Sequence, residues 1–128
     1  MRLLLDTHVL LWWIDDDPRL SSRSRALISA ADNTVAVSVA TVWEIAIKAG
    51  LGQLEAPPDL RGYLQAQLAR NRFELLPVLF EHAVAVRDLP PHHRDPFNRL
   101  LVAQSRVEGL ALITRDARLG AYAVEVLW

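Results

Sequence analysis

The sequence contains no cysteine among its 128 residues. Disulfide bonds and thiolate metal sites are therefore excluded. The absence of cysteine also agrees with a protein of the reducing cytoplasm, although many secreted proteins lack it too. Charge of one sign is not in excess either, because the formal net charge is −1. This balance argues against a basic footprint for nucleic acid spread over the whole sequence.

Long hydrophobic runs are missing as well. No apolar stretch reaches the roughly 18 residues that a membrane span needs, so we expect no contact with a membrane. The N-terminal segment, MRLLLDTHVLLWWIDDD, has the apolar character of a signal peptide. However, Asp6 interrupts it, and the acidic run 15–17 follows where small residues would mark a cleavage site. We interpret the segment as a buried strand that leads into a helix, and we expect a cytoplasmic protein.

Apolar runs of strand length alternate with segments of helical periodicity along the whole chain. The predicted strands are nearly continuously apolar, as parallel strands covered on both faces are, and they span Arg2–Leu5, Val35–Val39, Phe73–Val78, Ala111–Thr114 and Val124–Leu127. The predicted helices span Ser22–Ala31, Thr41–Gly50, Leu60–Asn71, Leu79–Leu89 and Pro96–Glu108. This alternation predicts an α/β fold: a three-layer α/β/α sandwich with a central parallel sheet of four to five strands. We expect residues 1–128 to form one domain.

Four acidic residues stand at predicted strand ends or helix starts. Asp6 follows the first strand, Glu44 lies in the first turn of the helix after the second strand, Asp95 precedes Pro96, and Asp116 follows the fourth strand. Because functional groups gather at the carboxyl ends of parallel strands, we expect these acids to converge on one edge of the sheet. Carboxylates without cysteine favour Mg²⁺, with Mn²⁺ as a substitute, over zinc.

The same acids also have structural interpretations. Asp6, Asp95 and Asp116 are typical helix caps. The run from Thr41 to Glu44 matches a capping box, and Lys48 is placed to pair with Glu44. Against this, Glu44 is flanked by apolar residues, and a buried carboxylate is costly unless it is paired or bound to a metal. From the residues alone, a metal site and a structural ion-pair network both remain open.

Two other groups of side chains are weaker candidates. His92 and His93 are adjacent, so they point in different directions and lack the spacing of a zinc site; we interpret them as part of a polar loop. Leu10, Trp12 and Trp13 on the first helix form either core or a dimer contact, and we favour core for two of the three.

Four strings together give a resemblance that covers essentially the whole chain: LLDTHVLLWW, SVATVWEIAIKAGLGQL, HRDPFNRLLVAQS and LITRDARL. They resemble the PIN domain family, specifically the VapC-like ribonuclease toxins of type II toxin–antitoxin systems. The resemblance implies a metal-dependent endoribonuclease that cuts RNA, forms a homodimer and is held inactive by a cognate VapB-like antitoxin. It implies that Asp6, Glu44, Asp95 and Asp116 are the catalytic and metal-binding acids.

One position departs from the family pattern. Relatives of this branch usually read D-P-F-D-R where this chain has Asp95-Pro96-Phe97-Asn98-Arg99. Asn98 therefore replaces the acid that aligns across the wider family. Its carbonyl can still act as a ligand, but it adds no negative charge, and Asp95 is placed to compensate. The substitution puts metal affinity and catalytic rate in question, but not the fold.

Neighbouring side chains are candidates for supporting roles. Arg94, Arg99, Arg115 and Arg118 flank the acids and are placed either to contact an RNA backbone or to lie solvated at helix ends. Thr7 and Thr114 are candidates for hydroxyl contacts to the acids.

Three other interpretations compete with this one. A receiver domain is excluded because Leu76-Pro77 and Leu127-Trp128 stand where it needs an aspartate and a lysine. A haloacid-dehalogenase-like phosphatase is excluded because His8 stands where it needs its second aspartate. The remaining alternative to an active nuclease is a weakened one that binds RNA or a protein without cutting.

Overall fold

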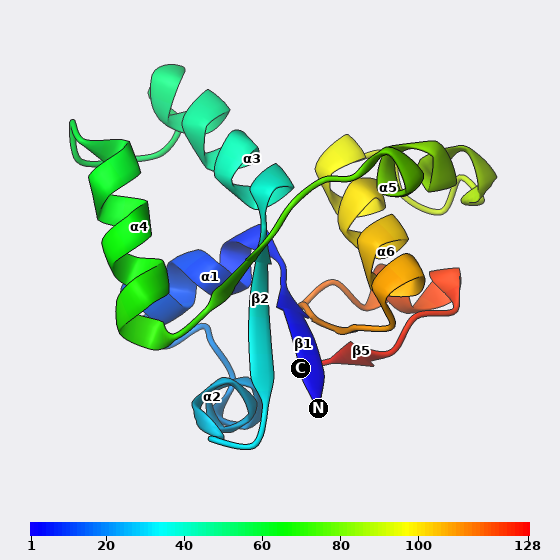
Figure 1. Ribbon diagram of the computed structural model, residues 1–128, viewed down its shortest axis with the longest axis horizontal. Helices are drawn as coiled ribbons and strands as arrows, with labels where there is room; N and C mark the ends of the chain where they lie inside the picture. Colours follow the sequence, from blue (N-terminus) through cyan, green and yellow to red (C-terminus); the bar gives the residue numbers. More distant parts are fainter.

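The computed structural model describes residues 1–128 and has one five-stranded sheet at its centre (Figure 1). All neighbouring strands are parallel, and their order is β3-β2-β1-β4-β5. The strands are β1 (Arg2–Leu5), β2 (Thr34–Ser38), β3 (Glu74–Leu76), β4 (Ala111–Ile113) and β5 (Val126–Leu127). β1 occupies the middle of the sheet, where its residues pair with β2 on one side and with β4 on the other.

Helices cover both faces of this sheet, as Figure 1 shows. The first group is α1 (Thr7–Ile14), α2 (Ser22–Ser29), α3 (Val39–Gly50) and α4 (Leu60–Asn71). The second group is α5 (Phe80–Ala85), the 3-10 helix η1 (Val86–Asp88), α6 (Pro96–Glu108) and the 3-10 helix η2 (Ala117–Tyr122). The predicted three-layer α/β/α sandwich is confirmed. None of these helices combines the length and the apolar character needed to cross a membrane.

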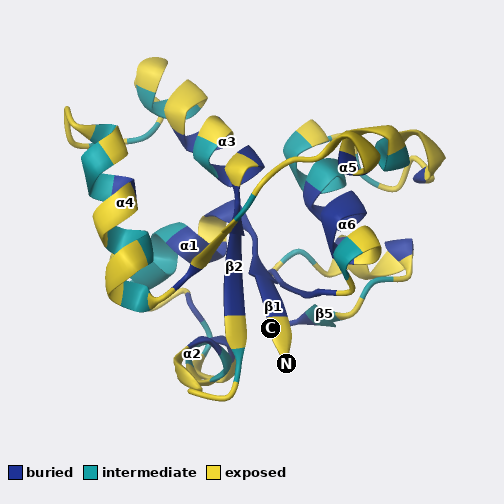
Figure 2. Ribbon diagram, viewed as in Figure 1, coloured by how far each residue is buried: buried dark blue, intermediate teal, exposed yellow.

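Two apolar cores follow from the alternation of side chains along each strand. Leu3 and Leu5 point into one core, where they join residues of α1 to α4. Leu4 points into the other, where it meets α6 and η2. The strands are therefore buried over most of their length (Figure 2). Three residues of α1 were candidates for either the core or a dimer contact. Leu10 is buried, and Trp12 and Trp13 are half-buried and pack against the first core.

Several predicted boundaries differ from the structure, each for a local reason. β2 ends at Ser38 rather than Val39, because the Ser38 hydroxyl accepts a hydrogen bond from the Ala40 amide and begins α3 there. The predicted capping box from Thr41 to Glu44 is consequently wrong, since both residues lie inside the helix. β5 is shorter than predicted because Ala123 takes a left-handed conformation with φ of 59°.

The other differences are of the same kind. β3 and β4 are shorter than predicted, α2 ends at Ser29 instead of Ala31, and the predicted helix Leu79–Leu89 is divided into α5 and η1. α4 and α6 have their predicted bounds. α6 begins at Pro96 with Asp95 as its N-cap and ends before Gly109, which has a φ of 68° that suits glycine.

Candidate active site

Three of the four predicted acids meet in one hollow at the carboxyl ends of β1 and β4. This carboxylate hollow has a volume of about 420 Å³, and Asp6, Asp95 and Asp116 line it. Asp6 caps α1, Asp95 caps α6, and Asp116 caps η2. The capping and clustering interpretations are therefore compatible, because each carboxylate binds a backbone amide at a helix start and still lines the hollow.

Asp6 is the deepest of the three carboxylates, with an exposed fraction of 6%. Its Oδ1 accepts a hydrogen bond from the Val9 amide at 2.9 Å, and its Oδ2 accepts one from the Thr114 hydroxyl at 2.5 Å. Burial raises the pKa of Asp6, although both hydrogen bonds act in the opposite direction. The Thr114 hydroxyl also accepts a hydrogen bond from the Asp116 amide, so Thr114 links two of the acids.

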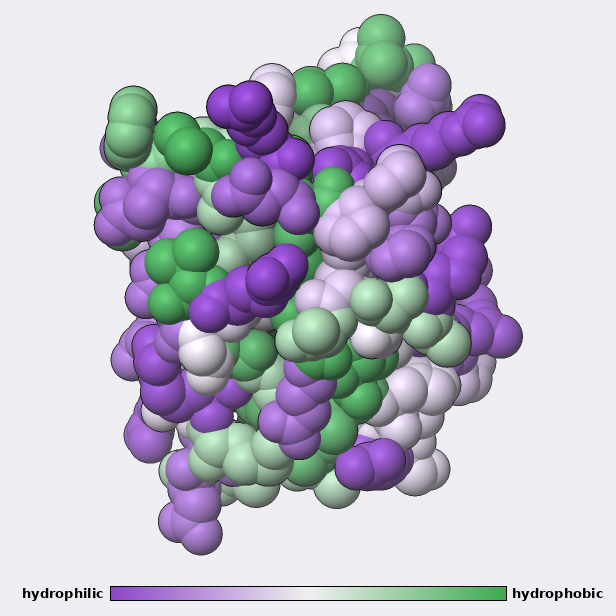
Figure 3. Space-filling model, turned by 90° about the vertical axis from the view of Figure 1, so that its right-hand side faces the viewer, coloured by the Kyte–Doolittle hydropathy of each residue, from purple (hydrophilic) through white to green (hydrophobic).

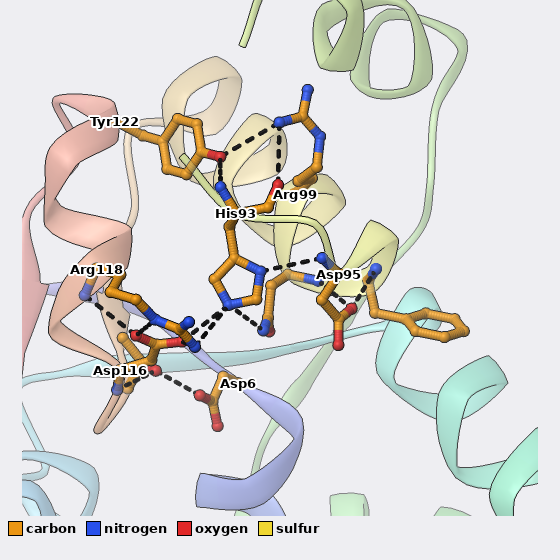
Figure 4. Close-up of polar contacts among 10 residues, drawn as sticks. Asp6, His93, Asp95, Arg99, Asp116, Arg118 and Tyr122 are labelled. Atoms are coloured by element: carbon orange, nitrogen blue, oxygen red, sulfur yellow. Dashed lines mark hydrogen bonds and ion pairs between the residues drawn. The ribbon is translucent and has the colours of Figure 1, made fainter. Parts of the chain in front are cut away.

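Asp116 is held by two cationic or polar side chains (Figure 4). Arg118 donates from Nε to Oδ1 at 2.9 Å and from Nη2 to Oδ2 at 2.8 Å, which is a two-point contact. His93 Nε2 lies 2.9 Å from the same Oδ2. The hydrogen bonds from Arg118 lower the pKa of Asp116 to about 2. Asp116 is therefore fully ionised at neutral pH.

His93 belongs to the site, although its sequence context predicts only a polar loop. Its Nδ1 accepts a hydrogen bond from the Asp95 amide at 3.0 Å, so in the neutral ring the proton sits on Nε2 and is donated to Asp116. Its own amide donates to the Tyr122 hydroxyl at 2.7 Å. His93 thus joins the start of α6 to the segment that follows β4. The signal in the sequence is its position two residues before the N-cap Asp95.

Asn98 faces the same hollow as the three carboxylates. The backbone amides of Asn98 and Phe97 donate hydrogen bonds to Oδ1 of Asp95, and these are the N-cap contacts of α6. The Asn98 side chain approaches His93, with Nδ2 at 3.5 Å from Nε2. Asparagine at this position therefore contributes an uncharged oxygen to the hollow, where an aspartate would add a fourth carboxylate.

Glu44 lies outside the lining of the hollow. It is 4% exposed, and its carboxylate is fully engaged: Oε1 accepts from the Thr7 hydroxyl at 2.6 Å and Oε2 contacts Lys48 Nζ at 2.5 Å. Lys48 supplies the opposite charge that a buried carboxylate needs. Glu44 still lies near enough to Asp6 that its negative charge raises the pKa of Asp6. The predicted contact from Thr7 to an acid is present, but the acid is Glu44.

The four candidate arginines separate into two pairs. Arg115 and Arg118 line the hollow. Arg99 points away from it and donates to backbone carbonyls of the segment 86–93 and to the Tyr122 hydroxyl, as Figure 4 shows in part. Arg94 is exposed next to His93 and does not line the hollow. Arg99 therefore positions the segment that presents His93.

The donor set suits a hard divalent cation, because carboxylates and one amide carbonyl supply only oxygen ligands. No three acidic or histidine side chains, however, lie close enough together to ligate one ion as they stand. Magnesium is usually held by one or two carboxylates together with water and substrate phosphate, so it does not require a complete protein cage. The residues fit such a cation once Asp116 is released from Arg118.

A family model for the PIN domain matches residues 3–125, which is nearly the whole chain, so the protein belongs to the PIN domain family. A curated relative, "Ribonuclease VapC22" of Mycobacterium tuberculosis, is 32% identical over 122 residues, covering 94% of this chain and 91% of the relative. The resemblance to the PIN domain is therefore confirmed.

Solved structures show the same fold. A chain of VapBC2 from Rickettsia felis, crystallised with a DNA fragment from their promoter, matches with a TM-score of 0.75 at 16% identity and covers 99% of this chain and 98% of its own. A chain of FitAcB from Neisseria gonorrhoeae matches with a TM-score of 0.66 at 20% identity, over 98% of this chain and 96% of its own. At these identities the likeness supports the fold alone.

Proposed function

We propose that this PIN domain is a divalent-metal-dependent endoribonuclease, the VapC-like toxin of a toxin–antitoxin pair. The observation that carries the proposal is the convergence of Asp6, Asp95 and Asp116, from three distant parts of the chain, in one hollow of a PIN fold. Its similarity to a curated ribonuclease gives independent support. The substrate is RNA, and residues 1–128 act as one domain in the cytoplasm.

Asp6 and Asp116 would hold the cation, with Asp95, Asn98 and the outlying Glu44 contributing directly or through water. When bound, Mg²⁺ or Mn²⁺ supplies acidification of a water molecule and neutralisation of phosphate charge. No protein nucleophile is needed for hydrolysis by water. Glu44 adds negative charge next to Asp6, while Lys48 limits the repulsion between the two.

The remaining residues of the site orient these groups and receive the substrate. Thr114 fixes the Asp6 carboxylate, and His93 fixes Asp116 by donating from Nε2. Arg115 and Arg118 are the cationic side chains of the hollow. Once freed from Asp116, the Arg118 guanidinium can contact two oxygens of an RNA phosphate, because its planar fork matches that geometry.

A homodimer and a VapB-like antitoxin are the proposed protein partners. Val39, Trp43 and Ile47 are spaced four residues apart on α3 and are 37%, 59% and 38% exposed. Phe80 and Val84 on α5 are 84% and 52% exposed. Figure 3 views the molecule from the side on which α5 lies in Figure 1, and green side chains stand among purple ones at the upper end of this face. Exposed apolar side chains of this kind, here called the apolar patches of α3 and α5, are typical of a protein contact.

A second candidate function is supported by a specific observation. Asp116 is paired with Arg118, Asn98 stands in place of an acid, and no three ligands are gathered for an ion. These features would also suit a PIN domain that binds RNA or a protein without cutting it.

The experiment that separates the two functions compares the wild type with Asp116→Asn on structured RNAs, in Mg²⁺, in Mn²⁺ and in chelator. We expect the wild type to cut only with metal and Asp116→Asn not to cut. Asp88→Asn, an exposed acid away from the hollow, is the matched control and should retain activity. Asn98→Asp should cut faster and bind Mn²⁺ more tightly in calorimetry, because it restores a charged ligand.

Two results would overturn the nuclease proposal. One is the absence of cleavage across a broad panel of RNAs together with no measurable Mn²⁺ binding. The other is cleavage that Asp116→Asn leaves intact, since this would indicate a contaminating nuclease.

A further inference from the structure

A second hollow, of about 350 Å³, adjoins the carboxylate hollow. His8 and Trp12 line both hollows and therefore form the boundary between them. Both side chains come from α1, whose N-cap is Asp6. Any ligand in the second hollow is consequently placed next to the carboxylates by the first turns of a single helix.

The Trp12 ring, which lies between the two hollows, is held in place by several contacts. The Trp12 ring makes an edge contact with Trp128, with ring centroids 5.9 Å apart, and lies 5.7 Å from the His8 ring. The guanidinium carbon of Arg19 lies 5.1 Å from the Trp12 centroid, and both oxygens of Asp17 hold Arg19 in turn. An indole whose position is already fixed loses little conformational freedom when a ligand stacks on it.

The rest of the hollow combines apolar walls with polar groups. Leu11, Ile45 and Leu54 supply the apolar part of the lining. Asp15 and Gln53 add a carboxylate and a carboxamide. A nucleobase has the matching chemistry, since its flat faces are stacked on aromatic rings and its edges carry hydrogen-bond donors and acceptors.

We propose that this hollow, the base hollow, binds one unpaired nucleobase of the RNA next to the phosphate that is cut, with Trp12 as the stacking surface. The proposal rests on the proposed function and names the part of the substrate that this region recognises. The volume lies near the lower end of the roughly 300–1,000 Å³ of small-ligand sites, so the base hollow takes a single base and not a duplex. Arg115, whose guanidinium carbon lies 6.0 Å from the Trp12 ring, adds positive charge for the flanking phosphates.

Binding is measured with labelled single-stranded RNA hexamers by fluorescence anisotropy, in chelator and in an Asp116→Asn background so that no RNA is cut. Trp12→Ala should weaken binding roughly ten- to hundredfold, the usual effect of removing a stacking ring. Trp12→Phe, which keeps a ring, should retain most of the affinity. Trp13→Phe is the matched control, because Trp13 neighbours Trp12 on α1 but lines neither hollow.

A second measurement identifies the base that lies on the Trp12 ring. In a set of hexamers, each base in turn is removed to leave an abasic residue. Removing one particular base should weaken binding by the two proteins that keep a ring at position 12, the wild-type Trp12 and Trp12→Phe, and should have little further effect on Trp12→Ala. Such coupling between one base and Trp12 would show direct stacking. A duplex of the same sequence should bind more weakly than the single strand.

The proposal is overturned if no abasic position is coupled to Trp12, or if Trp12→Ala binds RNA normally while losing a protein partner. Failure of this proposal can be distinguished from failure of the nuclease proposal. Coupling without cleavage by the wild type in Mg²⁺ supports the base hollow and refutes the nuclease, whereas cleavage without coupling does the reverse. Absence of RNA binding in every arm overturns the base hollow.

Discussion

At the scale of single residues, Arg118 binds the carboxylate of Asp116, which the proposed cation needs as a ligand. The Arg118 side chain is 71% exposed, so solvent screens its attraction to Asp116 and the pair contributes little to stability. A divalent cation has twice the charge and a more compact form than a guanidinium. It should therefore displace Arg118 at modest cost.

Replacing Arg118 by glutamine should accordingly tighten Mn²⁺ binding. We expect a gain of about two- to fivefold, the range set by an exposed ion pair, measured by isothermal titration calorimetry. Arg115→Gln is the control, because Arg115 lines the same hollow without contacting Asp116, and it should change affinity less. Unchanged or weaker binding by Arg118→Gln would show that Arg118 does not compete with the cation.

Asp6 and Asp116 should change the stability of the fold with pH in opposite directions, because the pKa of Asp6 is raised and that of Asp116 is lowered. Burial raises the pKa of Asp6 above its ordinary value of 3.8, so the folded protein holds this proton more tightly than the unfolded chain does. The charged form therefore lowers stability as the pH rises from about 4 through the raised pKa, and the loss is complete above that pKa.

Asp6→Asn should raise the melting temperature at pH 7 by a few degrees, even though it abolishes the proposed activity. Thermal unfolding followed by circular dichroism between pH 7 and pH 4 should show this advantage shrinking as the pH falls. Asp88→Asn should show no comparable trend. An Asp6→Asn protein that is less stable than the wild type at pH 7 would contradict the explanation.

At the scale of elements, the segment between η1 and α6 is organised by one side chain. Arg99 donates to the carbonyls of Val86, Leu89 and Pro90, and to the hydroxyl of Tyr122. Tyr122 accepts the His93 amide in turn. Arg99 thus connects α6 to the backbone that precedes it and to η2.

Arg99→Gln should loosen this segment, because the shorter side chain cannot reach the same acceptors. We expect faster hydrogen–deuterium exchange over residues 86–95 and a loss of about 1–3 kcal/mol in the free energy of unfolding by urea. The exposed Arg94 offers a control in Arg94→Gln, which should exchange like the wild type. Equal exchange in the two variants would mean that the segment holds its shape without Arg99.

Most elements could be predicted from the sequence because their signals are local. Asp95 followed by Pro96 marks the start of α6, and Gly109 marks its end. Boundaries were predicted wrongly where two residues could cap the same helix. Ser38, and not Thr41, is the N-cap of α3. In the site, Asp6, Asp95 and Asp116 could be grouped from their places at strand ends, and the structure puts them in one hollow. The contact between His93 and Asp116 could not be predicted, because it joins residues whose proximity depends on the packing of α6 against η2.

At the scale of the whole molecule, the apolar patches of α3 and α5 bear on assembly. Trp43 and Phe80, the largest side chains of the two patches, stay 59% and 84% exposed in the single chain. A second copy of the chain would remove this surface from water, and the gain would be mostly hydrophobic.

Phe80→Ser combined with Trp43→Ser should shift the protein from dimer to monomer in analytical ultracentrifugation. Dissociation should require at least a tenfold lower concentration for the wild type than for the double variant. Val107→Ser, which removes an exposed apolar side chain on α6 outside the two patches, serves as the control. A wild type that sediments as a monomer at all concentrations, or a double variant that stays dimeric, would rule out this surface as the dimer contact.

The spacing of the carboxylates along the chain has a consequence for biosynthesis. A nascent polypeptide presents Asp6 almost at once, whereas Asp95 follows only after β3 has been translated and Asp116 only after α6. β1 meanwhile lacks its central neighbour β4. Since chains emerge from the ribosome N-terminus first, the hollow cannot assemble on a half-made chain. The proposed nuclease activity can therefore begin only when translation of the chain is nearly finished.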